Sequence, residues 1–219
     1  MAKPDSKGRA VGRPRLFEDA TERRMLIDAA IAVMGRKGYA EMSVSDVLAE
    51  SGLSTRAFYR HFESKASLLD ALMLREATSV GRALARVVAS APDPVAAVEA
   101  WVERFLDVFY QPRRAERAAL FTAAEASASR SSDTLRREMR QISCGPLIDA
   151  LRAGHKAGVL VSPTPELDAF SIHDLISLCF HSWDQDRPAR DEVRHHMTRF
   201  AWPALRLRAP DARQRRRLG

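Results

Sequence analysis

The residues best suited to bind a partner lie in one short stretch with the sequence SGLSTRAFYRHFESK, residues 51–65. Phe58 and Phe62 are four residues apart, so a helix would place them on one face. The other side of that helix carries hydrogen-bond donors and one small residue, namely Arg56, Ala57, Tyr59 and Arg60. One face is therefore suited to a protein core and the other to a partner rich in hydrogen-bond acceptors.

The donor-rich face matches the chemistry of duplex DNA. The major groove is wide enough for an α-helix, and arginine makes paired hydrogen bonds to guanine O6 and N7. Ala57 would allow a close approach and could contact a thymine methyl, while Tyr59 and His61 can donate to phosphate oxygens. Ser43 and Lys65 stand beside expected helix N-termini, whose backbone amides attract anions. The alternative is that exposed arginine and tyrosine side chains only solvate a surface helix.

Helix signals on either side of this stretch indicate how it is positioned. Apolar residues recur every three or four positions, which predicts a helix over about 21–37 that ends at Gly38. The residues that can cap or end two shorter helices are Ser43 or Ser45, Gly52 and Ser54. A tight helix-turn-helix follows within residues 43–65. So many matching signals in one window favour DNA binding over a solvated surface helix.

The remainder of the chain also has helical periodicity, without the alternation that is typical of strands. Ser64 or a neighbour can cap a long helix that continues to about residue 90 with no linker. Further helices are expected over about 93–112, 113–129, 133–157, 165–183 and 191–207, with a kink at Gly145-Pro146. The expected fold class is all-α, with an N-terminal three-helix DNA-binding head containing the helix-turn-helix and a C-terminal bundle of about six helices.

Residues 21–72 also resemble the TetR-like one-component transcriptional regulators. The shared motifs are Gly-Tyr after the first helix, the Gly-Leu-Ser turn, Tyr-x-x-Phe and Ser-Lys-x-x-Leu-Leu. The resemblance implies a homodimer of two-domain all-α subunits, usually a repressor, which leaves its operator when a small ligand binds the C-terminal domain. Beyond about residue 75 the likeness is only one of helix pattern, so the identity of the ligand does not carry over.

The resemblance also implies which residues contact DNA. They are Ser43, Val44, Thr55, Arg56, Ala57, Tyr59, Arg60, His61 and Lys65. Ser54, the expected cap of the third helix, belongs to the same surface. Arg56 departs from the family pattern, because that position often holds a small residue, and Glu63 stands where proline is frequent. The base preference of the third helix is therefore not implied by the resemblance.

The charge distribution separates the two ends of the chain from its body. The formal net charge is +7, and basic residues are concentrated in 1–16 and 206–219. We expect a disordered basic arm over 1–16, a helix-turn-helix DNA-binding domain over 17–66, a ligand-binding and dimerisation domain over 67–208 and a disordered basic tail over 209–219. Arg13 and Arg15 of the arm either reach into a narrow minor groove or only add nonspecific attraction to phosphate.

The C-terminal bundle has more large apolar side chains than a narrow seam between helices needs. They either form its core or line a cavity for an apolar or aromatic ligand. The residues expected at the border of such a pocket are Phe105, Phe109, Phe121, Met139, Ile142 and His173. An unidentified small-molecule effector is therefore an expected partner.

The last two expected helices carry apolar residues on more than one face, which one subunit alone would not cover. This surplus predicts a homodimer with a symmetric four-helix interface. Its expected aromatic anchors are Phe180, Trp183, Phe200 and Trp202.

Other classes of function leave no signature in the sequence. A Gly-rich phosphate loop, a nucleophile elbow, HExxH and CxxC are absent, so we expect no catalytic residue, metal ligand or cofactor. An activator, a DNA-binding protein that ignores ligands, and an all-α enzyme or carrier remain alternatives. No apolar run approaches the roughly 18 residues of a membrane span, and the N-terminus lacks a secretory signal, so a cytoplasmic protein without membrane contact is expected.

Overall fold

The computed structural model describes residues 18–111, 120, 124, 133–181 and 188–206. Every regular element in these ranges is an α-helix, which confirms the predicted all-α class. The expected helix over 113–129 lies outside the described residues except for Leu120 and Ala124. Several predicted site residues are also outside the description, namely Arg13, Arg15, Phe121, Trp183 and the side chain of Phe180.

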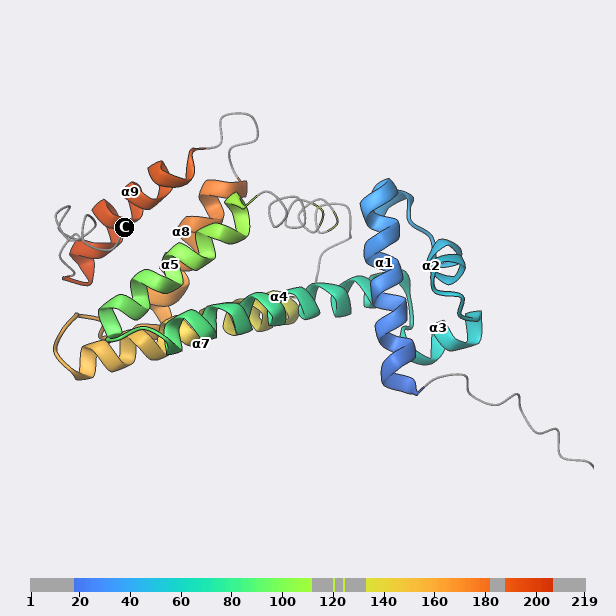
Figure 1. Ribbon diagram of the computed structural model, residues 1–219, viewed down its shortest axis with the longest axis horizontal. Helices are drawn as coiled ribbons and strands as arrows, with labels where there is room; N and C mark the ends of the chain where they lie inside the picture. The colour runs from blue at the N-terminus through green and yellow to red at the C-terminus, as the bar shows by residue number, and fades with distance from the viewer. Residues whose placement is uncertain (1–17, 112–119, 121–123, 125–132, 182–187, 207–219) are drawn as a thin grey trace, which may run out of the picture.

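The N-terminal head consists of three helices and the first turns of a fourth (Figure 1). In chain order they are α1 (Asp19–Glu41), α2 (Val44–Ser51), α3 (Thr55–His61) and α4 (Lys65–Ala89). Gly38 has φ 77° and ψ 167°, a backbone conformation that L side chains rarely adopt, so the regular part of α1 ends there as predicted.

Local hydrogen bonds at the helix ends make the turns of the head tight. The Ser43 hydroxyl accepts from the Asp46 N–H, and the Asp46 carboxylate accepts from the Ser43 N–H, which completes a capping box on α2. Gly52 ends α2 with φ 68°, and the Ser54 hydroxyl then caps α3 by accepting from the Ala57 N–H. The helix-turn-helix predicted within residues 43–65 is therefore present.

The core of the head extends into α4. Phe58 and Phe62 are 0% and 4% exposed and pack with Leu68, Leu72 and other apolar residues as far as Met73. The domain boundary expected after residue 66 falls in the first turn of α4, and this helix continues through it without interruption. The head and the body therefore share one continuous helix.

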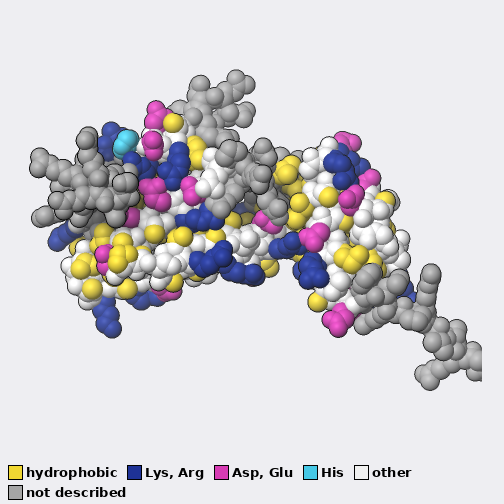
Figure 2. All heavy atoms as spheres, in the orientation of Figure 1, with side chains coloured by type: hydrophobic (Ala, Val, Ile, Leu, Met, Phe, Trp, Pro, Cys, Tyr) yellow, Lys and Arg dark blue, Asp and Glu magenta, His cyan; other side chains and the backbone are white. Residues whose placement is uncertain are grey.

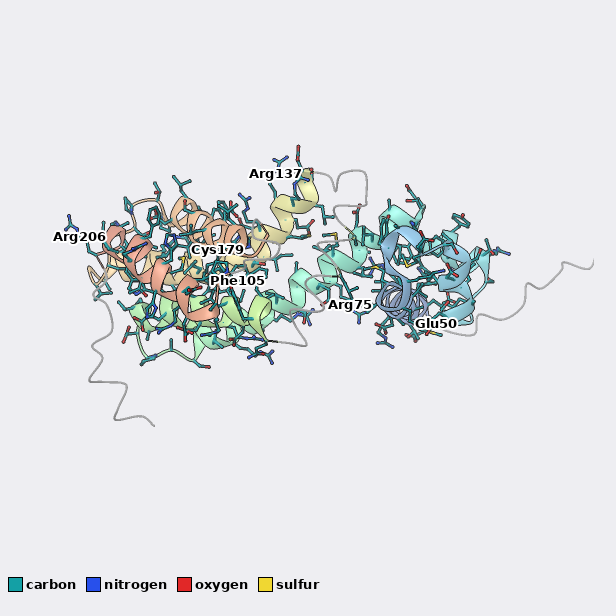
Figure 3. All side chains as sticks on the ribbon, turned by 90° about the horizontal axis from the view of Figure 1, so that it is seen from above. Glu50, Arg75, Phe105, Arg137, Cys179 and Arg206 are labelled. Carbon is teal, nitrogen blue, oxygen red and sulfur yellow. The ribbon has the colours of Figure 1, made fainter. Side chains whose placement is uncertain are left out.

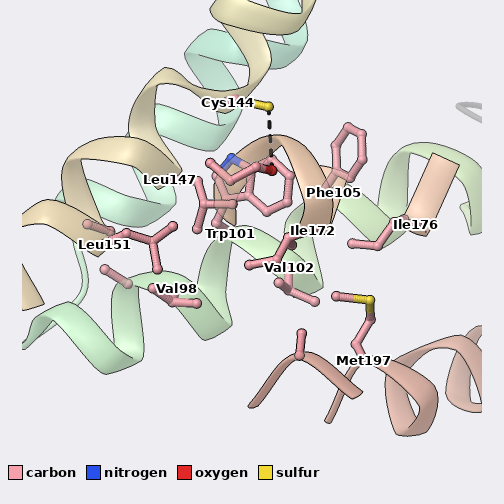
Figure 4. Close-up of a cluster of buried hydrophobic side chains, with 14 of the residues drawn as sticks. Val98, Trp101, Val102, Phe105, Cys144, Leu147, Leu151, Ile172, Ile176 and Met197 are labelled. Atoms are coloured by element: carbon pink, nitrogen blue, oxygen red, sulfur yellow. Dashed lines mark hydrogen bonds between the residues drawn. The ribbon is translucent and has the colours of Figure 1, made fainter. Parts of the chain in front are cut away.

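Besides the later turns of α4, the body contains four further described helices (Figure 1), of which α5 and α7 pack against α4. They are α5 (Pro94–Tyr110), α7 (Asp133–Lys156), α8 (Pro165–His181) and α9 (Arg190–Ala204). Trp101 lies at the centre of their core, fully buried, and its Nε1 donates to the carbonyl of Ser143 at 3.0 Å. Figure 4 shows Trp101 among apolar side chains from α5, α7, α8 and α9, together with the Cys144 thiol, which donates to the carbonyl of Ala169.

The α4 and α7 helices make the most extensive contact between any two described elements. At Gly81 they approach so closely that a Cβ atom would lie 2.8 Å from the carbonyl oxygen of Ile142. Near the head, Arg75 of α4 forms an ion pair with Asp28 of α1 at 2.6 Å; Figure 3 labels Arg75 in the part of α4 that joins the two regions. These contacts fix α4 to both the head and the body.

Candidate nucleic-acid interface

The exposed side of α3 is held in place by the aromatic residues on its buried side. Phe58 is fully buried, and its ring meets the ring of Tyr59 edge to face at a centroid distance of 5.3 Å. Tyr59 is nevertheless 58% exposed, and Thr55 and Arg56 are exposed too. The structure thus places three of the α3 residues expected to contact DNA at the surface, namely Thr55, Arg56 and Tyr59.

Ala57 does not belong to this exposed side. It is only 5% exposed and lies in the interior of the head, so its predicted contact with a thymine methyl is corrected. The helical-wheel argument placed it beside Arg56, but α3 is only seven residues long and packs on the head over a wider arc. The small side chain is explained by close packing rather than by an approach to DNA.

Arg60 and His61 are tied to a residue that sequence reasoning missed. Both side chains bond to the same carboxylate oxygen of Glu22 in α1, Arg60 through Nη2 and His61 through Nε2 at 3.1 Å. His61 and Glu22 are 8% and 5% exposed, so the predicted phosphate contact of His61 is corrected to a buried hydrogen bond. The bonds from His61 and Arg60 hold the pKa of the Glu22 carboxyl below its usual range.

One signal in the sequence could have identified Glu22. It lies one helical turn before Leu26, on the same face as Leu26 and Ala30, so the apolar stripe of α1 begins with a carboxylate. A buried carboxylate requires partners, and the nearest candidates were the cations of α3. Asp19, Glu22 and His61 also bring one donor atom each within 4.8 Å of one another, but the cation that pairs with Glu22 is the guanidinium of Arg60.

Ser43, Val44 and Lys65 lie beside the helix ends as expected, but two of their polar groups serve the fold. The Ser43 hydroxyl donates to Asp46 at 2.5 Å within the capping box. Lys65 donates from Nζ to the carbonyls of Tyr39 and Met42 at 3.0 and 2.9 Å, and lies over the Tyr39 ring. The ammonium of Lys65 therefore closes the end of α1, and its contact with DNA stays a prediction.

The residues predicted to border a ligand pocket are not all in one place. Phe105 and Phe109 are buried in the body, and the Phe105 ring lies 4.8 Å from the ring of His173. Ile142 faces Gly81 of α4, whereas Met139 packs against the core of the head. Met139 is thus corrected from a pocket residue to a contact between α7 and the head. Among the described members, the Phe105 ring contacts the rings of both Phe109 and His173.

The aromatic residues predicted for a dimer interface differ in their exposure. Trp202 is 4% exposed within the core of its own subunit, so its assignment to an intersubunit surface is corrected. Phe200 is 66% exposed on α9, and Leu178 of α8 is 58% exposed. Figure 2 shows yellow apolar side chains at the surface of the body on one face of the molecule. The interface itself stays a prediction.

Comparisons with known proteins support a regulator. Residues 26–72 match the family model described as bacterial regulatory proteins, tetR family. The chain is 28% identical over 206 residues to Rv0472c of Mycobacterium tuberculosis, an uncharacterised HTH-type transcriptional regulator, covering 89% of this chain and 82% of the relative. It is 31% identical over 81 residues to the HTH-type transcriptional regulator BetI of Brucella melitensis, covering 37% of this chain and 41% of BetI.

Solved structures share the fold over most of the chain. A TetR-family regulator from Pectobacterium atrosepticum has a TM-score of 0.68 at 22% identity, over 90% of this chain and all of that one. FadR from Bacillus subtilis, crystallised with stearoyl-CoA, has a TM-score of 0.61 at 17% identity, over 83% of this chain and 96% of FadR. None of the described helices has the length and apolar character needed to cross a lipid bilayer.

The segment that matches the family model, residues 26–72, contains the exposed helix α3. The family model covers most of the head, including the turn at Gly52 and the whole of α3, and full-length relatives are regulators rather than enzymes. The matches and the fold therefore support a TetR-like, DNA-binding transcriptional regulator with a helix-turn-helix head and a helical C-terminal domain.

Proposed function

We propose that the protein is a cytoplasmic repressor that binds a near-palindromic operator as a homodimer and is released when a small, largely apolar molecule binds the C-terminal domain. The observation that carries the proposal is the exposed side of α3, where Arg56 and Tyr59 project from a helix anchored by Phe58. In a dimer, the two α3 helices would enter successive major grooves with centres about 34–36 Å apart. Occupying such a site blocks transcription from an overlapping promoter.

The residues proposed to contact DNA differ in role. Arg56 is the best candidate for reading a guanine, because its guanidinium lies on the exposed face of α3. Ser54, Thr55 and Tyr59 are placed to donate to phosphates, and the backbone amide of Val44 at the start of α2 offers a further donor. Arg60 lies at the end of α3 and would contact DNA in the orientation in which Glu22 holds it.

The route from ligand to DNA would run through α4. This helix contributes to the head core through Leu68 and Leu72, and to the body core through Leu84. A ligand beside the cluster of Phe105, Phe109 and His173 would alter how α4 and α7 pack and thereby the separation of the two heads. FadR, a structural neighbour, was crystallised with stearoyl-CoA, which supports an apolar or acyl-bearing effector for this fold.

The proposal is tested by fluorescence anisotropy with duplexes from the region upstream of the gene. We expect a sequence-selective, salt-sensitive complex that Arg56→Ala weakens by about 1–3 kcal/mol and Tyr59→Ala by less. Arg152→Ala is the matched control, because Arg152 is an exposed arginine of α7 that pairs with Asp149 and Glu166 in the body. Equal effects of Arg56→Ala and Arg152→Ala would contradict the proposed interface.

The same assay tests release by a ligand. Apolar small molecules, acyl-CoA among them, are added to the preformed complex. A true effector is expected to weaken DNA binding by about 5- to 150-fold, which corresponds to the usual coupling energies between two sites. It should also raise the melting temperature of the free protein in proportion to occupancy. A molecule that stabilises the protein and tightens the DNA complex would instead indicate a corepressor.

A further inference from the structure

Glu22 occupies an unusual position for a carboxylate in the head. Its side chain is 5% exposed although it lies in the first turn of α1. Taking a carboxylate out of water is unfavourable unless it is paired and hydrogen-bonded. Here both partners come from the C-terminal end of α3, since Arg60 and His61 converge on one oxygen of Glu22. The ion pair therefore connects α1 to the helix proposed to read DNA.

The arrangement also limits what the Arg60 guanidinium can do. Its Nη2 bonds to Glu22 and its Nε lies 3.7 Å from the carboxylate of Asp19, so two carboxylates flank a side chain that is 32% exposed. A free arginine samples many rotamers and attracts any phosphate. A paired arginine keeps one orientation, and most of its charge is neutralised. Arg56, whose side chain is exposed, lies one turn earlier on the same helix.

We propose that Glu22 is a positioning residue that sets DNA specificity by holding Arg60 in one orientation and by suppressing its attraction to phosphates of unrelated DNA. This inference rests on the proposed function. Glu22 itself touches no base in this scheme, because it acts through Arg60. As a consequence, the affinity of the head for DNA depends more on the exposed side of α3 that reads the sequence, and less on the charge of Arg60 at the C-terminal end of α3.

The variant that separates this role from a purely structural one is Glu22→Gln, which keeps the shape and removes the charge. We expect Arg60 to become available to phosphates, so that affinity for a scrambled duplex rises several-fold at low salt. The dependence of log affinity on log salt should steepen by about 0.9, the contribution of one additional neutralised phosphate. The ratio of affinities for selected and scrambled DNA should fall by about tenfold, because a free arginine discriminates poorly.

The experiment uses the full chain and a duplex selected from a random pool by the wild type. Binding to this duplex and to a scrambled one is measured between about 50 and 200 mM KCl, a range over which phosphate contacts change affinity by orders of magnitude. Glu50→Gln is the matched control, because Glu50 lies in the same head and its ion pair, at 2.5 Å, is with Arg36 of α1 rather than with an arginine of α3. The double variant Glu22→Gln with Arg60→Gln restores the wild-type net charge and should restore its salt dependence.

Equal effects of Glu22→Gln and Glu50→Gln would overturn the proposal, because a general change of charge would then explain both. An unchanged affinity ratio in Glu22→Gln would overturn it as well. If Glu22→Gln melts below the assay temperature, the salt dependence of DNA binding is compared between Arg56→Gln and Arg60→Gln instead. The proposal expects Arg60→Gln to change the salt dependence clearly less than Arg56→Gln does. Equal changes in the two variants refute the proposal. A wild type that selects no duplex at all refutes the proposed function instead.

Discussion

At the scale of single residues, Asp46 shows how one carboxylate connects two helices of the head. It accepts the N–H of Ser43 at 2.7 Å and forms an ion pair with Lys37 of α1 at 2.6 Å. The hydrogen bond from Lys37 and those from Ser43 hold the pKa of Asp46 far below its usual range. The start of α2 is thus attached to the end of α1 through a side chain that must be ionised.

Asp46→Asn is expected to change how the stability of the head depends on pH. A carboxyl whose pKa is lowered by folding stabilises the fold above its unfolded value of about 3.9, and this stabilisation is lost as pH falls through the folded value. The variant should be less stable than wild type at pH 7, and the difference should shrink in acid. Urea unfolding followed by circular dichroism at pH 7 and at low pH measures both.

The control for this prediction is Asp28→Asn. Asp28 is an exposed carboxylate of α1 that pairs with Arg75, so its removal changes the net charge of the head by the same amount. If Asp46→Asn and wild type lose the same free energy of unfolding on acidification, the capping contact does not have the proposed pH dependence.

Individual residues were predicted well where their role depends on local sequence. Ser54 and Gly52 were identified because caps and left-handed turns are encoded within a few residues. Glu22 and Met139 were missed or misplaced because their partners, Arg60 and the core of the head, are distant in sequence. Periodicity can tell that a side chain faces inward, but not which element it will meet.

At the scale of helices, boundaries were predicted to within a few residues. The sequence places the start of α5 at Asp93 and Pro94, and the structure begins it at Pro94 with Asp93 as the cap. For α7, the structure has a helix that continues through Pro146, so the kink that the sequence predicts at Gly145-Pro146 stays a prediction. Capping is local chemistry, whereas the shape of a long helix depends on the helices against which it packs.

The crossing of α4 and α7 provides a prediction at this scale. Gly81→Ala would place a methyl group 2.6 Å from Cγ2 and 2.8 Å from the carbonyl oxygen of Ile142. A backbone atom cannot move aside without moving its helix, so we expect a loss of about 1–3 kcal/mol in the free energy of unfolding. DNA affinity should change too, because α4 continues into the head.

Gly35→Ala is the matched control for the helix crossing. Gly35 lies within α1, and a Cβ at that position meets nothing within 4 Å. The same substitution should therefore stabilise the head by about 0.4–1 kcal/mol. Urea denaturation compares the two variants with wild type. Stabilisation by Gly81→Ala would show that α4 and α7 do not pack as closely as described.

At the scale of the whole molecule, α4 connects the head and the body because it belongs to the cores of both. Its first turns belong to the core of the head and its later turns to the core of the body. Arg75 and Met139 add contacts between the two regions. Repacking of the body is therefore expected to reorient the head, and the effect on DNA depends on whether two heads are held at a fixed separation.

That separation would be set by the proposed dimer, whose best described anchor is Phe200. It is 66% exposed and, with Leu175 and Ile172, lines a mostly apolar hollow between α8 and α9. Phe200→Glu should cost at least about 2 kcal/mol if this aromatic ring is central to the interface, and so raise the dimer dissociation constant by about 30-fold or more. Sedimentation velocity over a concentration series measures the change.

A monomeric variant should also lose operator binding, because one α3 helix contacts only half of a palindromic site. Val159→Glu is the control, since Val159 is an apolar residue, 50% exposed beyond the end of α7, and its substitution makes the same change of charge. A dimer that survives Phe200→Glu would move the interface away from this hollow. A monomer that still binds DNA with undiminished affinity would contradict the link between dimerisation and operator recognition, because the two heads would then act independently.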